Sequence, residues 1–210
     1  MDKEDNHLQD TETRILQAAE KEFFEKGYGG ARTASIAEAA GVTHAMLHYY
    51  FRTKDKLFEQ IVSEKINKLG DIVLSAIGDS NLPLAERIRQ GVEHHFDFIA
   101  ANRELPRFLV NEVYVRPERI GAMVSGMQSV ASALLDNLQH EIDECAAQGQ
   151  CRQIDARMLL IDIVSLNVFP FMAAPIVEGA IGSFYESYDE FLAMRKKENV
   201  ETVLRKLKIY

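Results

Sequence analysis

The sequence predicts an all-α protein of about nine helices. Its 210 residues are 47% hydrophobic, which is ample for an extensive core. Apolar residues recur every three or four positions along most of the chain, as they do on the buried side of an amphipathic helix. Clusters of glycine, proline and polar residues separate these segments, and no segment shows the alternation typical of strands. We therefore expect helices joined by short turns.

Residues 1–10 are polar and acidic, and we expect them to form a flexible tail. They carry no cleavable signal pattern, which favours a cytoplasmic protein. The first helix should begin near Asp10 or Thr11 and end at Lys26. Its buried side is predicted to comprise Ile15, Leu16, Ala18, Ala19 and Phe23. Three glycines should end this helix: Gly27, Gly29 and Gly30.

Residues 32–56 predict two short helices joined by a tight turn. Thr33 and Ser35 place hydroxyl groups where the first of these helices must start, and Ser35 with Glu38 fits a capping box. Gly41 should end this helix, because glycine enters the left-handed conformation without steric cost. Two short helices joined in this way have the outline of a DNA-reading element.

The second helix of the pair should begin after Thr43, which is placed to cap it. Leu47 and Phe51 lie four positions apart and are expected on its buried side. Small and hydrogen-bonding side chains then face outward: His44, Ala45, Met46 and His48. Hydroxyl and basic groups follow them: Tyr49, Tyr50, Arg52, Lys54 and Lys56. Such a surface suits a major groove flanked by phosphates.

The charge distribution supports this interpretation, although the chain carries a net charge of −8. Residues 32–56 contain four basic and two acidic residues, a local net charge of +2. An acidic remainder should suppress non-specific binding to DNA.

Four linked motifs between residues 13 and 57 resemble the N-terminal domain of TetR-family transcriptional regulators. They are ILxAA, FxEKGY, a hydroxyl residue before IAxxAGV, and LxxxFxxKxxL. Together they are far more specific than a lone helix-turn-helix pattern. Ala45 stands where the family often has glycine, and His48 and Tyr50 where it usually has tyrosine and histidine. These exchanges keep hydrogen-bonding groups near the phosphates.

The resemblance implies a three-helix DNA-binding domain over residues 11–56 and an effector-binding and dimerisation domain over residues 57–210. By position, phosphate contacts are expected from Thr33, His48, Tyr49, Tyr50 and Lys54, and base contacts from Thr43, His44, Ala45 and Met46. One helix-turn-helix reads too few base pairs for useful specificity, so a homodimer on a palindromic operator is expected. In the family, two C-terminal helices of each subunit form a four-helix bundle, which assigns residues 154–175 and 188–207 to the dimer.

The remaining helices follow from breaks in the apolar pattern. A long helix should run from Thr53 to about Ile77, and the tract 78–83 separates it from a helix that opens at Leu84. Further helices are expected over 104–115, from Pro117 through Ile142, over 154–179 and from Ser187 to about Lys208. A polar turn at 147–153 precedes the most hydrophobic of them.

That hydrophobic segment, 154–179, resembles a membrane span in composition. Asp162, Ser165 and Asn167 interrupt it, and Pro170 and Pro175 should kink it. We therefore expect no membrane contact, and a helix buried between its own domain and a partner.

A pocket for a small, mostly apolar effector is implied by the resemblance. Its predicted lining is His95, Phe96, Phe108, Tyr114, Met123, Met127, Asn167 and Phe171. Aromatic and methionine residues at helical spacing are more often ordinary core. His95 lies on an apolar stripe, either as a core histidine with a hydrogen-bond partner or as a polar anchor in the cavity.

No catalytic motif, phosphate loop or cofactor-binding pattern is present in the sequence, so we expect neither an enzyme nor a cofactor. Two alternatives remain. One is an all-α enzyme with a metal or acid-base site made by His94, His95 and Asp97, or by His140 and Glu144. The other is a helical adaptor that binds another protein. Cys145 and Cys151 are expected to be reduced thiols. The main hypothesis is a repressor that its effector releases from DNA.

Overall fold

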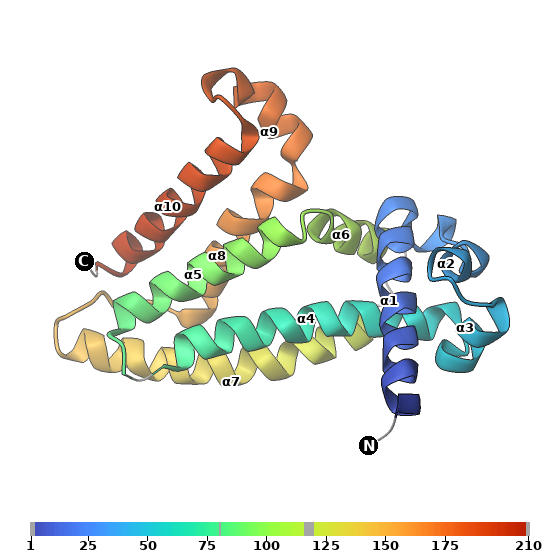
Figure 1. Ribbon diagram of the computed structural model, residues 1–210. Coiled ribbons are helices and arrows are strands. Elements are labelled where there is room, and N and C mark those ends of the chain that lie inside the picture. Colours follow the sequence, from blue (N-terminus) through green and yellow to red (C-terminus); the bar gives the residue numbers. More distant parts are fainter. Residues whose placement is uncertain (1–2, 80, 116–119, 209–210) are drawn as a thin grey trace. The chain divides into compact units, whose positions relative to one another are not determined.

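A computed structural model describes residues 3–79, 81–115 and 120–208, and its ribbon is shown in Figure 1. The described residues form ten α-helices, one short 3-10 helix and no strand. The all-α prediction is confirmed, with one helix more than expected. The helices are α1 (Lys3–Gly30), α2 (Thr33–Ala39), α3 (His44–Phe51), α4 (Lys54–Gly78), α5 (Leu84–Ala101), α6 (Leu105–Val115), α7 (Ile120–Ala147), α8 (Ala156–Met172), α9 (Ala174–Ile181) and α10 (Tyr188–Leu207).

The chain divides into two compact units. Unit 1 comprises Met1–Ile66 and Phe108–Gly126, and unit 2 comprises Asn67–Arg107 and Met127–Tyr210. Helices α4, α6 and α7 therefore each contribute residues to both units.

The core of unit 1 joins α1, α2, α3, the first part of α4 and residues of α6. Its fully buried members include the apolar stripe predicted for the first helix, Ile15, Ala19 and Phe23. From the other helices it contains Ile36, Leu47, Phe51, Leu57, Phe58, Ile61 and Phe108. Leu16 and Ala18 pack against this core while partly exposed. Periodicity thus located the buried side of each of these helices.

One prediction about α1 is wrong, and another is confirmed in part, since Gly27 breaks the helix after Lys26 as predicted. The helix begins at Lys3 rather than near residue 10, because extending a helix that is already formed costs far less than starting one. Of the three glycines expected to end it, only Gly27 leaves the helical conformation, with φ 65° and ψ 169°. The chain then resumes helical geometry as far as Gly30, so Gly27 is a break within α1 rather than its end.

The capping box predicted for α2 is also wrong. The N-cap is Arg32, without a side-chain capping bond, and Ser35 lies inside the helix. The carboxylate of Glu22 in α1 accepts the Arg32 N–H at 3.2 Å, so a tertiary contact replaces the local cap. At the other end the prediction is confirmed, since Gly41 has φ 65° and its N–H donates to the carbonyl of Glu38.

In unit 2, α5, α8 and α10 pack against one another. Their shared core includes Ile88, Val92, Leu159, Ile163, Val200, Val203, Leu204 and Leu207, joined by Leu138 and Ile142 of α7. Arg87 of α5 is buried and binds Glu141 of α7 through two hydrogen bonds of 2.6 Å. Paired guanidinium and carboxylate groups of this kind fix the relative orientation of two helices.

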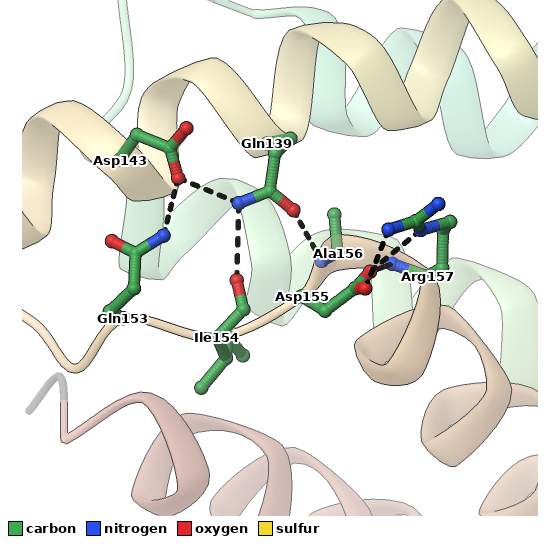
Figure 2. Close-up of polar contacts among 7 residues, drawn as sticks. All are labelled: Gln139, Asp143, Gln153, Ile154, Asp155, Ala156 and Arg157. Atoms are coloured by element: carbon green, nitrogen blue, oxygen red, sulfur yellow. Dashed lines mark hydrogen bonds and ion pairs between the residues drawn. The ribbon is translucent and has the colours of Figure 1, made fainter.

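The start of α8 is held by side chains of α7, as Figure 2 shows. Gln139 accepts the Ala156 N–H at 2.8 Å and donates to the Ile154 carbonyl at 3.2 Å. Asp155 caps α8 by accepting the Arg157 N–H at 2.8 Å. The helix therefore begins at Ala156, two residues later than predicted, because these bonds hold the preceding backbone in an extended conformation.

The hydrophobic segment from 154 to 179 is divided into α8 and α9. The two helices are bent by 77°, with Pro170 in the last turn of α8 and Pro175 in the first turn of α9. The predicted kink is confirmed. Proline has no backbone N–H and so cannot make the hydrogen bond that would continue a straight helix. Among the described residues no single helix is long and apolar enough to cross a membrane. Taken together, α8 and α9 reach that length and apolar composition, but they are bent at the break between them.

Candidate nucleic-acid interface

Helix α3 presents the side predicted to contact DNA. Leu47 and Phe51 are 1% and 4% exposed and fix the orientation of the helix on the core of unit 1. The residues expected to meet base edges, Thr43, His44, Ala45 and Met46, are all exposed. Thr43 caps the helix as predicted, accepting the Met46 N–H at 3.2 Å. Burial and capping thus leave the outer face of α3 free of core packing.

The two imidazole rings on this face are held in defined positions. His44 Nε2 and Thr33 Oγ1 share a hydrogen bond of 3.0 Å, and the ring centroids of His44 and His48 are 4.4 Å apart. His48 Nδ1 donates to the Arg52 carbonyl at 3.0 Å. In neutral His48 the proton therefore lies on Nδ1, and Nε2 remains an acceptor. Donors and acceptors with fixed positions are what base recognition requires.

The two tyrosines of α3 differ in their surroundings. Tyr49 is 78% exposed, whereas Tyr50 is half-buried and packs against the core of unit 1. Their rings meet edge to face, with centroids 5.5 Å apart. Tyr49 is therefore the freer of the two for a phosphate.

The junction between α3 and α4 is built around Tyr28 of α1, which sequence reasoning did not select. Lys54 Nζ donates to the Ala31 carbonyl at 2.5 Å and lies 4.4 Å from the centroid of the Tyr28 ring. The Tyr28 hydroxyl donates to Asp55 Oδ1 at 2.9 Å. The predicted phosphate ligand Lys54 thus also has a structural position within unit 1. The sequence signal was an aromatic residue directly after the glycine of FxEKGY.

The other charges of the predicted interface lie on the surface. Arg32, Arg52 and Lys56 are exposed, as are the acidic Glu38 and Asp55. Lys56 pairs with Glu59 at 2.7 Å, and this hydrogen bond raises its pKa above the usual value. Basic side chains are therefore exposed at the end of α3 and the start of α4, although Lys56 already has an acidic partner.

Four of the residues predicted for the effector pocket come together in unit 2. Phe96 and Phe171 pack edge to face with centroids 5.3 Å apart, and Asn167 Nδ2 lies 3.1 Å from His95 Nδ1. Two other predicted residues, Phe108 and Tyr114, belong to unit 1 instead. Phe108 is buried in the core of unit 1, and Tyr114 is 81% exposed. The side chains of Met123 and Met127 lie outside the described part of the structure.

His95 belongs to a buried polar network that includes Asn199, a residue missed at the sequence level. Asn167 Nδ2 donates to His95 Nδ1 and to the Val92 carbonyl, and Asn167 Oδ1 accepts from Asn199 Nδ2 at 2.8 Å. Burial lowers the pKa of His95 to about 4, so the ring is neutral at pH 7. One asparagine within a charged helix gave no signal, because its partners lie 32 residues away.

The metal site considered in the enzyme alternative does not form among the described residues. No group of three His, Cys, Asp or Glu side chains there is placed to hold a metal ion. His94 is exposed while His95 is buried, and His140 and Glu144 form an exposed pair at 3.7 Å. Cys145 and Cys151 are free and half-buried. Burial and the adjacent Cys145 raise the pKa of Cys151 to about 12, so this thiol is protonated at neutral pH.

Comparison with known proteins gives matches along most of the chain. The family model for bacterial regulatory proteins of the tetR family matches residues 15–61, and that for the tetracyclin repressor-like C-terminal domain matches residues 85–203. The HTH-type transcriptional regulator RutR of Escherichia coli K12 is 28% identical over 193 residues, covering 90% of this chain and 86% of RutR. The HTH-type transcriptional activator FasR of Mycolicibacterium smegmatis is 26% identical over 156 residues, covering 74% of this chain and 68% of FasR.

A solved structure shares the fold at lower identity. The transcriptional regulator SCO4942 from Streptomyces coelicolor superposes with a TM-score of 0.70 at 22% identity, covering 94% of this chain and 98% of that one.

Proposed function

The chain belongs to the tetR family of bacterial regulatory proteins, and we propose that it is a homodimeric repressor released from a palindromic operator by a small, mostly apolar effector. It is a DNA-binding transcriptional regulator and not an enzyme. To this we add three proposals: that the regulator represses transcription, that it acts as a homodimer, and that a small, mostly apolar effector is its ligand.

The outer face of α3 carries the proposal for DNA recognition. Thr43, His44, Ala45 and Met46 are exposed at its N-terminal end, where a recognition helix contacts base edges. Groups suited to phosphates surround them: Thr33, His48, Tyr49, Tyr50 and Lys54. The acidic remainder of the chain disfavours other modes of DNA binding.

An exposed apolar stripe on α8 supports the homodimer. Met158, Ile161, Phe169 and Met172 recur at helical spacing and are 37 to 58% exposed. Met194 of α10 is likewise 53% exposed. All of them lie within residues 154–175 and 188–207, the segments assigned to the dimer. Exposed apolar side chains that recur along one side of a helix are typical of a protein contact.

The effector is proposed to bind in unit 2, beside Phe96, Phe171 and the His95–Asn167 pair. A ligand can shift the protein between two states only by binding them unequally. A differential of roughly 5 kcal/mol converts an almost fully bound repressor into an almost fully released one. A movement of α4, which has residues in both units, would alter the spacing of the two recognition helices.

The deciding experiment is selection of bound duplexes from random DNA with the purified full chain. We expect an enriched palindrome whose half-sites lie about one DNA turn apart, or a multiple of that distance. A folded dimer that enriches no sequence at low salt would disprove the DNA-binding proposal. A folded monomer by light scattering would instead support the adaptor alternative.

Two variants test the assigned roles. Lys54→Ala should weaken binding about equally for all sequences, because phosphate contacts carry no sequence information. His44→Ala should change the preference at one base position of each half-site. Binding of the selected palindrome and its single-base variants measures both effects. Identical profiles for the two variants would contradict the roles.

FasR, named as an activator, motivates the alternative to repression. A promoter fusion carrying the selected operator distinguishes the two outputs. Repression predicts that deletion of the regulator raises expression of the reporter, and activation predicts that it lowers it.

A further inference from the structure

A carboxylate of α6 holds the backbone at the break in α1. Glu112 Oε1 accepts the Tyr28 N–H at 2.8 Å, although 84 residues separate the two along the chain. The other oxygen, Oε2, is buried without a hydrogen-bond partner among the described residues. Burying an unpaired carboxylate oxygen is costly, so Glu112 stays here because the bond to Tyr28 and the packing of α6 offset that cost.

Tyr28 in turn contacts the first residues of α4, directly after the turn that follows α3. Its ring is 8% exposed and packs against Phe23 and Phe58, with centroid distances of 5.9 and 5.2 Å. Its hydroxyl binds Asp55, and its ring lies under the ammonium of Lys54. Lys54 and Asp55 are the first two residues of α4 and stand only a few positions after the last residue of α3. Glu112 therefore forms a hydrogen bond with the backbone of the same residue whose side chain contacts the start of α4.

Apolar contacts attach the same part of α6 to unit 1. Phe108 is 5% exposed and packs against Phe24 and Phe58, with centroid distances of 4.9 and 5.6 Å. Leu109 packs against the same core. The first three residues of α6, 105–107, belong to unit 2. The helix therefore carries the chain from unit 2 into the unit that bears α3.

We propose that Glu112 is a positioning residue for DNA recognition: it fixes Tyr28, and through Tyr28 the α3–α4 junction, while α6 is docked on unit 1. Any shift of α6 that draws the carboxylate away from the Tyr28 N–H loosens this junction. The inference deepens and rests on the proposed function, because it gives the regulated DNA-binding surface a specific point of control. The break at Gly27 directly precedes this contact in the chain, and its φ of 65° sets the backbone from which the Tyr28 N–H donates.

The test compares Glu112→Ala, which removes the acceptor, with Glu112→Gln, which retains one. Asn111→Ala, at the exposed neighbouring position, is the control. Two quantities are measured: the Kd for the selected palindrome, and amide hydrogen exchange of residues 27–32 and 52–56 without DNA. Loss of a hydrogen bond to a charged acceptor should make E112A bind about tenfold more weakly. Exchange in both segments should also be faster in E112A, whereas E112Q should stay within about threefold of the wild-type Kd and N111A should match it.

A purely structural role for Glu112 would lower the thermal unfolding midpoint without a selective effect on these two segments or rescue by glutamine. If E112A does not fold, Glu112→Asp serves instead, because it keeps the charge but draws the carboxylate back by one methylene. Wild-type affinity and exchange in a folded E112A or E112D would overturn the proposal. If wild-type protein selects no duplex, the proposed function fails, and the exchange measurement still tests the contact between α6 and the junction.

Discussion

Gly27 shows how one residue shapes the candidate interface. Its φ of 65° and ψ of 169° belong to a region that glycine alone occupies without strain. The break that it makes in α1 turns the Tyr28 N–H towards Glu112 and places the Tyr28 ring beside Lys54. Gly29 and Gly30 have no positive φ, so the three glycines, similar in the sequence, differ in what the backbone requires of them.

The variant Gly27→Ala should destabilise the protein by about 1–3 kcal/mol, the usual cost of forcing a side chain into this backbone region. Gly29→Ala is the control, because a Cβ there meets no atom within 4 Å and the residue is helical. It should be neutral or slightly stabilising, since alanine favours a helix over glycine. Denaturant unfolding measures both, and equal stabilities of the two variants would refute the strain argument.

Single residues also mark where local reasoning failed. Ser35 and Glu38 satisfied the pattern of a capping box, yet the backbone at the start of α2 donates to Glu22 of another helix. A capping motif reports only a local possibility, and a tertiary partner with a full charge can replace it.

At the scale of elements, the recognition helix was the most predictable part. Thr43, Leu47, Phe51 and Gly41 have the caps, burial and backbone conformation that the sequence predicts. These features depend on residues within one or two helical turns, which the sequence displays directly. The junction after α3 was not predictable, because Tyr28 reaches it from another helix.

Helix α8 has two apolar sides, and one of them is buried by other described residues of the chain while the other is exposed. Leu159, Ile163 and Asn167 face the core of unit 2, whereas Ile161 and Phe169 are exposed. Periodicity alone could not separate the sides, since nearly every turn of the helix is hydrophobic. The structure makes the division by packing α8 against α5 and α10.

The variant Ile161→Asp should abolish the dimer without unfolding the subunit, because this side chain is 58% exposed in the single chain. A charge in the middle of an apolar contact leaves an unpaired buried carboxylate in the dimer. Ile176→Asp on α9 is the control, being 73% exposed and outside the two segments assigned to the dimer. Light scattering at micromolar concentration should give a monomer for I161D and a dimer for I176D. A dimeric I161D would place the subunit contact elsewhere.

At the scale of the whole chain, unit 2 is held together by polar as well as apolar contacts. His95, Asn167 and Asn199 come from α5, α8 and α10, and their hydrogen bonds connect helices distant in sequence. Asn199 also donates to the Leu166 carbonyl at 3.0 Å. Asn199 Oδ1 is buried without a hydrogen-bond partner among the described residues. The other bonds of the network still favour this packing arrangement, because an arrangement that breaks them would leave more buried polar groups unpaired.

This network predicts how stability depends on pH. Burial depresses the pKa of His95 from 6.5 to about 4, so between these values the unfolded chain binds more protons than the folded one. The stabilisation is complete above pH 6.5 and is lost as pH falls towards 4, by about 3 kcal/mol from this residue. Protonation would also set an N–H of His95 against the donor Nδ2 of Asn167.

Denaturant unfolding at several pH values tests this prediction. His95→Gln should flatten the dependence between pH 6.5 and 4, whereas His94→Gln, at the exposed neighbouring position, should leave it unchanged. An unaltered dependence in H95Q would assign the acid sensitivity to other groups.

The sequence by itself determined the all-α class, the positions of most helices and the outward face of α3, since these depend on apolar periodicity and on caps within a few residues. The tertiary structure decided which predicted pocket residues meet. Phe96 and Phe171 lie together, but Phe108 belongs to the other unit and Tyr114 points to the surface. It also revealed Tyr28, Glu112 and Asn199, whose roles depend on partners 27, 84 and 32 residues away. Helical periodicity tells which side of a helix is buried, but not which other helix covers it, and only the packed chain supplies that partner.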